Sequence, residues 1–472
     1  MAVLLTLALG LALVGDMPMG SVPKAYAAPA AQLAGTLVSG VTVQNLNKTT
    51  PANIVIKFYD QSGTQVPPLS GVSAVLPAGG QRTWYLPTHV PELPSPFLGS
   101  AIVESDRLVM ASVNTQLPSG TNPMRLGTAL GVSSPSTRAY LPQILKDYYG
   151  WNSHFAVQNA GASAASVRVK YIDLGGSEVV AARQTRTIQP NASFLYKPSD
   201  NGSLPSGFGG SVVVESDQPI ATQADFFNAG TDVSTMQFHS YNGFSSGGTK
   251  VYLPRLVRGY YDYNSGLRVQ NVSDRVADVT ITYYFGSTVV SKNLTLNPGQ
   301  AGGPYLGSNN SDTSGLPAGV SGSAVITSNV PVVATINEDN RVLGRGVTFN
   351  GVPDGQQTAN LFFPQVTARY YGYSSGIQVQ NVGSSVAQCT ATFTMAGRDP
   401  ITVNFSIQPN KAWSKFIPDV DGIGWDFNGA VTVTSNRSIV GIANMSFRSD
   451  RDSRYSPIEG DTFATYNGTN IE

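Results

Sequence analysis

Apolar and polar residues alternate along much of this chain with a period of two, which is the pattern of half-buried β-strands. In VADVTITYYFGSTVV, the apolar residues Val279, Ile281 and Tyr283 alternate with Thr280, Thr282 and Tyr284 before a Gly-Ser pair turns the chain. The pattern predicts a hairpin with one buried face. The same face is apolar in two earlier stretches, at Val167, Val169 and Tyr171 and, after one inserted residue, at Ile54, Ile56 and Phe58.

The chain contains an internal repeat of about 112 residues. A Gln-Asn pair recurs at Gln44, Gln158, Gln270 and Gln380, and a glycine-led segment recurs as GSAIVESDRLVMAS, GSVVVESDQPIATQ, GSAVITSNVPVVAT and GAVTVTSNRSIVGI. A third anchor, such as FHSYNGFSSG, lies near the end of each copy. We therefore predict a signal peptide at residues 1–27 and four β-sandwich repeats at 28–136, 137–249, 250–359 and 360–472.

Each repeat contains roughly seven short predicted strands separated by turn residues, and no amphipathic helical stretch. Pro-Gly or Pro-Asn turns precede the glycine-led strand, and a Ser-Asx pair after it predicts a hairpin turn into a return strand. The predicted fold class is all-β, with four tandem immunoglobulin-like antiparallel β-sandwich repeats.

The repeats resemble the immunoglobulin-like modules of secreted and cell-surface proteins of bacteria, in which VQN strands, Y-x-D-x-x-G hairpins and L-P-x-G turns recur. The matching pieces of the first repeat are VQNLNKTTPANIVIKFYDQSG and LPAGG, and their counterparts extend the resemblance over about residues 40–455. The resemblance implies an extracellular scaffold, adhesive or surface-layer role and brings no catalytic residues, because a fold alone does not confer an activity.

The N-terminal sequence MAVLLTLALGLALVG is an apolar run of signal-peptide length, and Ala25-Tyr26-Ala27 fits the cleavage rule. No Lys or Arg precedes the run, so an N-terminal membrane anchor is the alternative. No second long apolar run predicts a membrane span after cleavage. We expect a secreted protein at the cell surface.

The charge balance excludes an electrostatic attraction to nucleic acid, because charged residues make up 12% of the chain and Lys+Arg 29 equals Asp+Glu 29. Cys389, the one cysteine, aligns with the inward-facing Val279 and is interpreted as a core residue. His89, His154 and His239 fall at non-equivalent points of the repeat and form no ligand motif. The pairs Glu104/Asp106 and Glu215/Asp217 become Thr and Asn in the other copies, which favours a turn over acid-base chemistry. We predict no enzyme activity, catalytic residue, cofactor or metal.

Three aromatic clusters occur within long copies of one segment, exemplified by YLPRLVRGYYDYNSGLRVQNVS from Tyr252. Exposed aromatic rings beside amides are typical of glycan contacts, whereas rings at the start of a repeat are typical of a domain junction. The first repeat has no such cluster, which favours the junction. The candidate residues are Tyr148, Tyr149, Trp151, Tyr260, Tyr261, Tyr263, Tyr370, Tyr371 and Tyr373.

These patterns predict a non-catalytic structural or adhesive protein shaped as a rod of about 150 Å. One alternative is a carbohydrate-binding protein that uses the aromatic clusters. Another is a self-assembling surface-layer or filament subunit, in which an open sheet edge at the end of the fourth repeat pairs with another copy. Expected partners are cell-envelope glycans, other surface proteins or copies of the same chain, and no nucleic acid.

Overall fold

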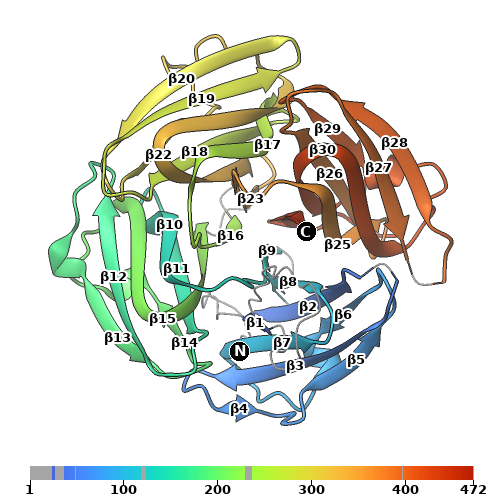
Figure 1. Ribbon diagram of the computed structural model, residues 1–472, viewed down its shortest axis with the longest axis horizontal. Helices are drawn as coiled ribbons and strands as arrows, with labels where there is room; N and C mark the ends of the chain where they lie inside the picture. Colours follow the sequence, from blue (N-terminus) through green and yellow to red (C-terminus); the bar gives the residue numbers. More distant parts are fainter. Residues whose placement is uncertain are drawn as a thin grey trace.

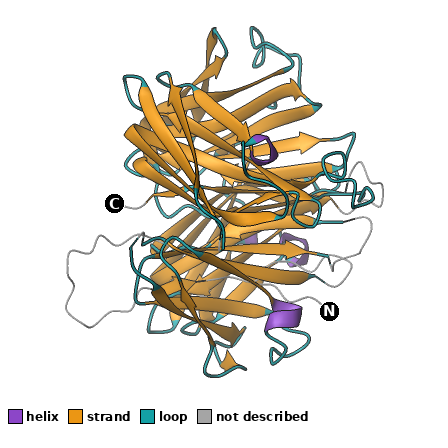
Figure 2. Ribbon diagram, turned by 90° about the vertical axis from the view of Figure 1, so that its right-hand side faces the viewer, coloured by secondary structure: helices purple, strands orange, loops and turns teal. Residues whose placement is uncertain are grey.

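The computed structural model describes residues 24–26, 37–47, 49–117, 124–228, 236–395 and 397–470. Strands dominate the described residues (Figure 2), and the named strands pair antiparallel, so the predicted all-β class is confirmed. Most of the predicted signal peptide lies outside the described residues. Its residues Lys24–Tyr26 are described and form strand β1.

We call the four successive groups of strands units one to four. Unit one contains β1 (Lys24–Tyr26), β2 (Val38–Asn45), β3 (Ala52–Asp60), β4 (Gln65–Val66), β5 (Val72–Leu76), β6 (Gln81–Tyr85), α1 (Leu86–His89), β7 (Gly99–Ser105), β8 (Val109–Gln116) and β9 (Leu126–Leu130). Unit two contains β10 (Ser136–Lys146), β11 (Trp151–Asn159), β12 (Ala165–Asp173), η1 (Val180–Ala182), β13 (Gln184–Ile188), β14 (Ser193–Tyr196), η2 (Pro198–Asp200), β15 (Phe208–Asn228) and β16 (Phe238–Asn242).

The remaining two units repeat this order. Unit three contains β17 (Gly248–Tyr260), β18 (Tyr263–Asn271), β19 (Ala277–Phe285), β20 (Thr288–Leu296), β21 (Ala301–Gly302), β22 (Val320–Asn340), β23 (Arg345–Asn350) and β24 (Val352–Pro353). Unit four contains β25 (Thr358–Ala368), β26 (Tyr373–Asn381), β27 (Ala387–Thr394), β28 (Ile401–Ile407), β29 (Ala412–Phe416), η4 (Ile417–Asp419), β30 (Phe427–Phe447), β31 (Phe463–Asn467) and β32 (Thr469–Asn470).

Each unit is a sandwich of two sheets, and in units two, three and four one long strand belongs to both sheets. In unit two, the rim sheet has the order β13-β12-β15-β10 and the axis sheet has the order β14-β11-β15-β16. The predicted hairpin β19–β20 is confirmed, with Phe285 paired to Thr288 across the turn. In unit one, β7 and β8 are separate strands, so its two sheets are also separate.

The hairpin turn predicted at each Ser-Asx pair is wrong. The strands β15, β22 and β30 run through this point for 21 residues each and cross from the rim sheet to the axis sheet. The Ser-Asx pair instead fixes the bend, because the Asp217 carboxylate accepts the Ser166 N–H at 2.7 Å and the Ser216 hydroxyl accepts the Gln218 N–H at 3.1 Å. Equivalent bonds occur in the other units. The prediction that the Ser-Asx pair bonds nearby backbone was therefore correct, but the prediction that the chain reverses there into a hairpin was wrong.

The four units close into a ring, so the predicted rod is also wrong (Figure 1). The edge strand β10 of unit two lies against β18 and β22 of unit three, and β17 of unit three lies against β26 and β30 of unit four. Strand β25 of unit four lies against β2 and β8 of unit one and completes the circle. The expected open edge at the end of unit four is therefore occupied: β31 pairs with β30, and β32 returns to pair with β25.

The first aromatic residue of each repeated segment packs at these junctions. Tyr140 shares a buried cluster with Val272 and Val333 of unit three, and its hydroxyl donates to the Val272 carbonyl at 3.2 Å. Tyr252 shares a cluster with residues of unit four, and Phe362 shares one with residues of unit one. Sequence reasoning concentrated on the later aromatic clusters and missed these three residues, although they open the segments that it aligned.

Unit one contains a short counterpart of this edge strand. In β1, Lys24 pairs with Glu104 and Ala25 with Val103, the same register in which β17 places Lys250 and Val251 on β22. The short sequence KAY thus corresponds to KVY at residues 250–252. Assigning it to the signal peptide concealed this match, and cleavage after Ala27 would remove β1.

The Gln-Asn pairs that revealed the repeat have separate structural roles. The Asn271 side chain donates to the carbonyls of Arg275 and Leu296 and so holds its own unit's loops together. The Gln270 side chain donates to Gly299 in its own unit and to Val212 in the preceding unit. Asn271 therefore stabilises its own unit, and Gln270 also bonds the preceding unit.

Four short strands, β9, β16, β23 and β31, surround the axis of the ring (Figure 1). At one end, Asn242 bonds unit one through both the N–H and the carbonyl of Leu130, and Asn350 and Asn467 continue the chain of bonds into units three and four. At the other end, the Asp461 carboxylate accepts N–H bonds from Phe238 at 2.9 Å and Gly346 at 3.1 Å. Asparagine and aspartate side chains thus tie the units together where their backbones converge.

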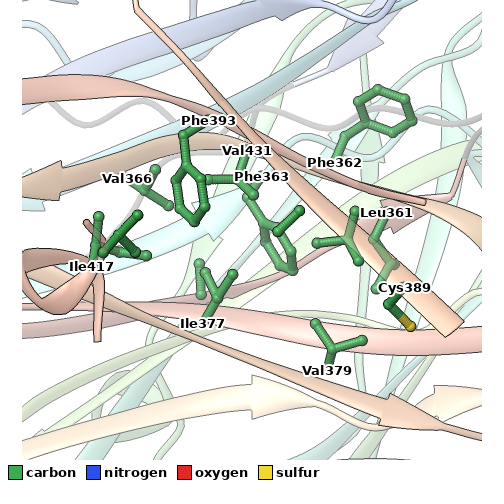
Figure 3. Packing of buried hydrophobic residues seen from close by; sticks show 14 of the residues in the cluster. Leu361, Phe362, Phe363, Val366, Ile377, Val379, Cys389, Phe393, Ile417 and Val431 are labelled. Atoms are coloured by element: carbon green, nitrogen blue, oxygen red, sulfur yellow. The ribbon is translucent and has the colours of Figure 1, made fainter. Parts of the chain in front are cut away.

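Each unit has an apolar core of its own between its two sheets. Cys389 lies in the core of unit four near Val379 and Leu361 (Figure 3) and is 4% exposed. Burial raises the pKa of its thiol. The interpretation of Cys389 as a core residue in a valine position is confirmed.

We predict that small-angle X-ray scattering will give a radius of gyration near that of a compact chain of this length, about 23 Å. A straight rod of about 150 Å would give about 43 Å instead. A value near the second figure would contradict ring closure.

We predict that Tyr140→Ala will lower the free energy of unfolding by about 3–5 kcal/mol, because it leaves a cavity at the junction of units two and three. Tyr140→Phe, which installs the residue found at Phe362, removes only one hydrogen bond and will cost about 1 kcal/mol. Urea unfolding measures both variants. Equal effects of the two substitutions would show that the ring does not pack as described.

Candidate functional site

The predicted aromatic clusters lie at tight turns between the first two long strands of units two, three and four. In unit two, the Tyr148 and Trp151 backbones exchange hydrogen bonds of 3.0 and 2.9 Å around the central residues Tyr149 and Gly150. Both central residues have positive φ, 51° and 83°, which is the pattern of a type I′ turn. Tyr261-Asp262 and Tyr371-Gly372 occupy the same positions with positive φ.

The middle tyrosine of each cluster points into solvent. Tyr149, Tyr261 and Tyr371 are 86%, 78% and 65% exposed. Each lies edge-on against the preceding tyrosine at a centroid distance of 4.7–4.8 Å, so the ring is held away from the turn. The three turns stand at equivalent places between the first two long strands of units two, three and four, so we infer that they lie on the same face of the ring.

The third aromatic residue of each cluster is directed inward. Trp151 contacts Phe226 and His239, Tyr373 contacts Phe447, and Tyr263 reaches Phe463 of the next unit. Burial raises the pKa of both Tyr263 and Tyr373 to about 12. Within each cluster, the middle residue is thus exposed to solvent and the third residue packs against other aromatic side chains inside the ring.

A cleft of about 520 Å³ lies between units two and three, next to the first cluster. Unit two contributes Tyr148, Tyr149 and Trp151 to its lining, and unit three contributes Tyr305 and Arg268. The cleft therefore gathers all three candidate residues of unit two. Sequence reasoning missed Tyr305 and Arg268. Tyr305 lies outside the repeated aromatic segment, and Arg268 lies inside it but lines a cleft with residues of the preceding unit.

The Tyr305 ring is fixed by its neighbours. A side chain at Gly266 would come within 3.4 Å of this ring, and one at Gly307 would come within 2.6 Å. Its hydroxyl donates to Asp339 at 3.0 Å, and the Arg341 guanidinium lies 5.0 Å from its centroid. Tyr305 thus forms a rigid aromatic wall of the cleft.

The cleft also contains the guanidinium of Arg268, a residue that is half-buried. Burial lowers the pKa of Arg268, and the charge is partly supported by the Tyr148 hydroxyl. Within the described ranges, no carboxylate forms an ion pair with Arg268, whereas the cleft carboxylate of Asp339 is paired with Arg341 at 2.9 Å.

Two of the three histidines are buried in unit two. Burial lowers the pKa of His154 to about 4 and that of His239 to about 3. His239 lies beside Trp151 and bonds Thr348 of unit three at 3.0 Å, and His154 lies against Phe227. His89 bonds the backbone of Tyr85 on the surface, so the structure does not bring the three together.

Several acidic side chains form ion pairs with basic ones. Glu104 pairs with Lys57 at 2.6 Å and Glu215 with Lys170 at 2.8 Å, while Arg454 pairs with Asp426 and Asp452. Among the described residues, no group of three or more His, Cys, Asp or Glu side chains could hold a metal ion. In the same part of the chain, no helix has the length and apolar character of a membrane span.

We predict that the free energy of unfolding falls by about 2 kcal/mol per buried histidine between pH 7 and pH 5. The folded-state pKa is below the unfolded value, so the unfolded chain binds the proton first as the pH falls. His154→Gly, which installs the residue found at Gly266 and Gly376, removes one of these contributions. Unfolding measured across this pH range should show a shallower dependence in the variant, and an unchanged dependence would contradict the assignment.

No protein-family model matches this chain, and no curated protein sequence matches it either. Among solved structures, it is similar to Thermotoga maritima 1070, with 22% identity over 23% of this chain and 96% of that one and a TM-score of 0.20. The Anabaena sensory rhodopsin transducer shows 26% identity over 19% and 92% of the two chains, with a TM-score of 0.16.

A longer alignment covers 99% of this chain and 99% of a tetra-tandem repeat from the extending region of a large adhesion protein, at 13% identity and a TM-score of 0.12. The function is therefore argued below from the geometry of the site.

Proposed function

We propose that this chain is a non-catalytic, extracellular adhesive protein that binds carbohydrate through the tyrosine turns on one face of its ring. The rings that contact the ligand are Tyr149, Tyr261 and Tyr371. Each presents a flat apolar surface with a hydroxyl at its edge, which is the combination that stacks on a sugar ring and bonds its hydroxyl groups.

The conformation of these tyrosines is the observation that carries the proposal. Both central residues of a type I′ turn have positive φ, a conformation that favours Asn, Asp or Gly and is unfavourable for a bulky side chain. All three turns nevertheless carry a tyrosine at the first central position, and its ring is in solvent, where it contributes little to the core. Strain at an exposed ring in three equivalent places supports a role in binding.

The closed ring adds a multivalent arrangement. Three tyrosine turns on one rigid face can engage one polymeric ligand together, and the binding of the first turn then raises the effective concentration at the others. Repeating polysaccharides of a cell envelope offer such a ligand. Tyr148, Tyr260 and Tyr370 support the exposed rings and remain proposed contacts at the rim, and Trp151, Tyr263 and Tyr373 are proposed to brace the turns at the junctions.

We predict that the triple variant Tyr149→Asn, Tyr261→Asn and Tyr371→Asn will lose glycan-array binding by more than tenfold. Asparagine suits the left-handed backbone better than tyrosine, so the thermal midpoint of the variant will not fall. Loss of binding with unchanged stability would show that the three tyrosine rings contact the glycan.

The matched control is Val289→Asn, which removes an exposed apolar side chain from the outer strand β20. It should leave glycan binding intact. Binding that survives in the triple variant, or a wild-type protein that binds no glycan on the array, would contradict the proposed function.

A further inference from the structure

The cleft between units two and three combines three features that a ligand must match. Trp151 and Tyr305 supply aromatic surfaces from opposite units, Arg268 supplies a positive charge, and the amides of Gln143 and Asn337 lie along the lining. Its volume of about 520 Å³ is in the range of small-molecule sites. A ligand that satisfies all three features has an apolar face, an anionic group and hydroxyl groups.

Arg268 determines the charge of that ligand. Its guanidinium lines the cleft and forms no ion pair with a carboxylate among the described residues, and the cleft carboxylate of Asp339 is already bonded to Arg341 and Tyr305. A planar guanidinium pairs best with a carboxylate, which it can bind through two parallel hydrogen bonds.

The cleft is specific to this junction. The residue equivalent to Arg268 is Gln378 in unit four, Ala156 in unit two and Thr42 in unit one. At the junction of units three and four, Arg255 stands at the edge-strand position that Gln143 has in the cleft, and it forms an ion pair with Glu338 at 2.7 Å. The junction of units two and three thus combines an aromatic cleft with a guanidinium that forms no ion pair with a carboxylate among the described residues.

We propose that this cleft binds the carboxylate-bearing sugar of an acidic polysaccharide, a uronic acid, with the pyranose ring between Trp151 and Tyr305 and the carboxylate on Arg268. This inference rests on the proposed carbohydrate binding and gives it a substrate class. The Asn337 amide donates to the Gln143 Oε1 and accepts from the Thr348 hydroxyl, so the Gln143 Nε2 amide is the group proposed to meet a sugar hydroxyl. Binding is non-covalent and changes no bond of the ligand.

The test is a calorimetric titration of the full-length protein with galacturonate, with glucose as the neutral probe and benzoate as the aromatic carboxylate. We expect galacturonate to bind at least tenfold more tightly than either probe. Equal binding of glucose would remove the role of the charge, and equal binding of benzoate would remove the role of the hydroxyls. Either result overturns the assignment.

Arg268→Gln is the matched variant, because glutamine is the native residue at this position in unit four. It should fold with unchanged circular dichroism and weaken galacturonate binding at least tenfold. Trp151→Phe keeps an aromatic ring and should weaken binding less. Unchanged affinity in the folded Arg268→Gln protein would overturn the proposal.

A second variant separates this proposal from the proposed function. Tyr261→Asn with Tyr371→Asn alters two turns that lie outside the cleft, so polysaccharide binding should fall while galacturonate affinity stays the same. If polysaccharide binding falls but the wild type does not bind galacturonate, the adhesive function stands and the cleft assignment fails. If the wild type binds galacturonate and the two turn substitutions do not change polysaccharide binding, the cleft assignment stands and the proposed role of the tyrosine turns is wrong.

Discussion

The packing of one edge strand onto the next unit is the interaction on which this structure depends. Strands β10, β17 and β25 belong to their own rim sheets by hydrogen bonding, and each also covers the axis sheet of its neighbour. Tyr140, Tyr252 and Phe362 bury their rings at this contact. Burial of apolar surface at three such junctions turns the chain through a closed circle, and the closure brings units one and four together.

Closure of the ring brings four strands together at the axis, where polar backbone and side-chain groups are buried and need hydrogen-bond partners. The groups there are satisfied from neighbouring units: Asn242, Asn350 and Asn467 bond adjacent backbones, and Asp461 accepts N–H groups from more than one unit. Burial raises the pKa of Asp461, while these N–H donors and the nearby Arg345 act in the opposite direction. Buried polar groups with such partners give the ring a defined register, because a shifted arrangement would leave them unpaired.

Because of ring closure, residues at equivalent positions of the units have different neighbours. Gly266 leaves room for the Tyr305 ring against β18. Unit two has His154 at the equivalent position, and the edge strand of the unit before it, β1, is only three residues long. The tyrosine turns repeat three times, but the cleft forms where Tyr305 and Arg268 of one unit meet Trp151 of another. A repeated scaffold thus carries both a repeated surface and a single site.

The sequence by itself determined the local structure. Alternation at Val279, Ile281 and Tyr283 gave the buried strand face, the Gln-Asn spacing gave the repeat, and Cys389 was placed correctly in the core. Period and turn chemistry are local properties, so they can be read along the chain. The tertiary structure decided the rest: the Ser-Asx pair is a bend within one strand, KAY at residues 24–26 is an edge strand, and the units form a ring. Tyr305 and Arg268 belong to the candidate site only because closure of the ring brings two units together, and such long-range packing leaves no periodic signal in the sequence.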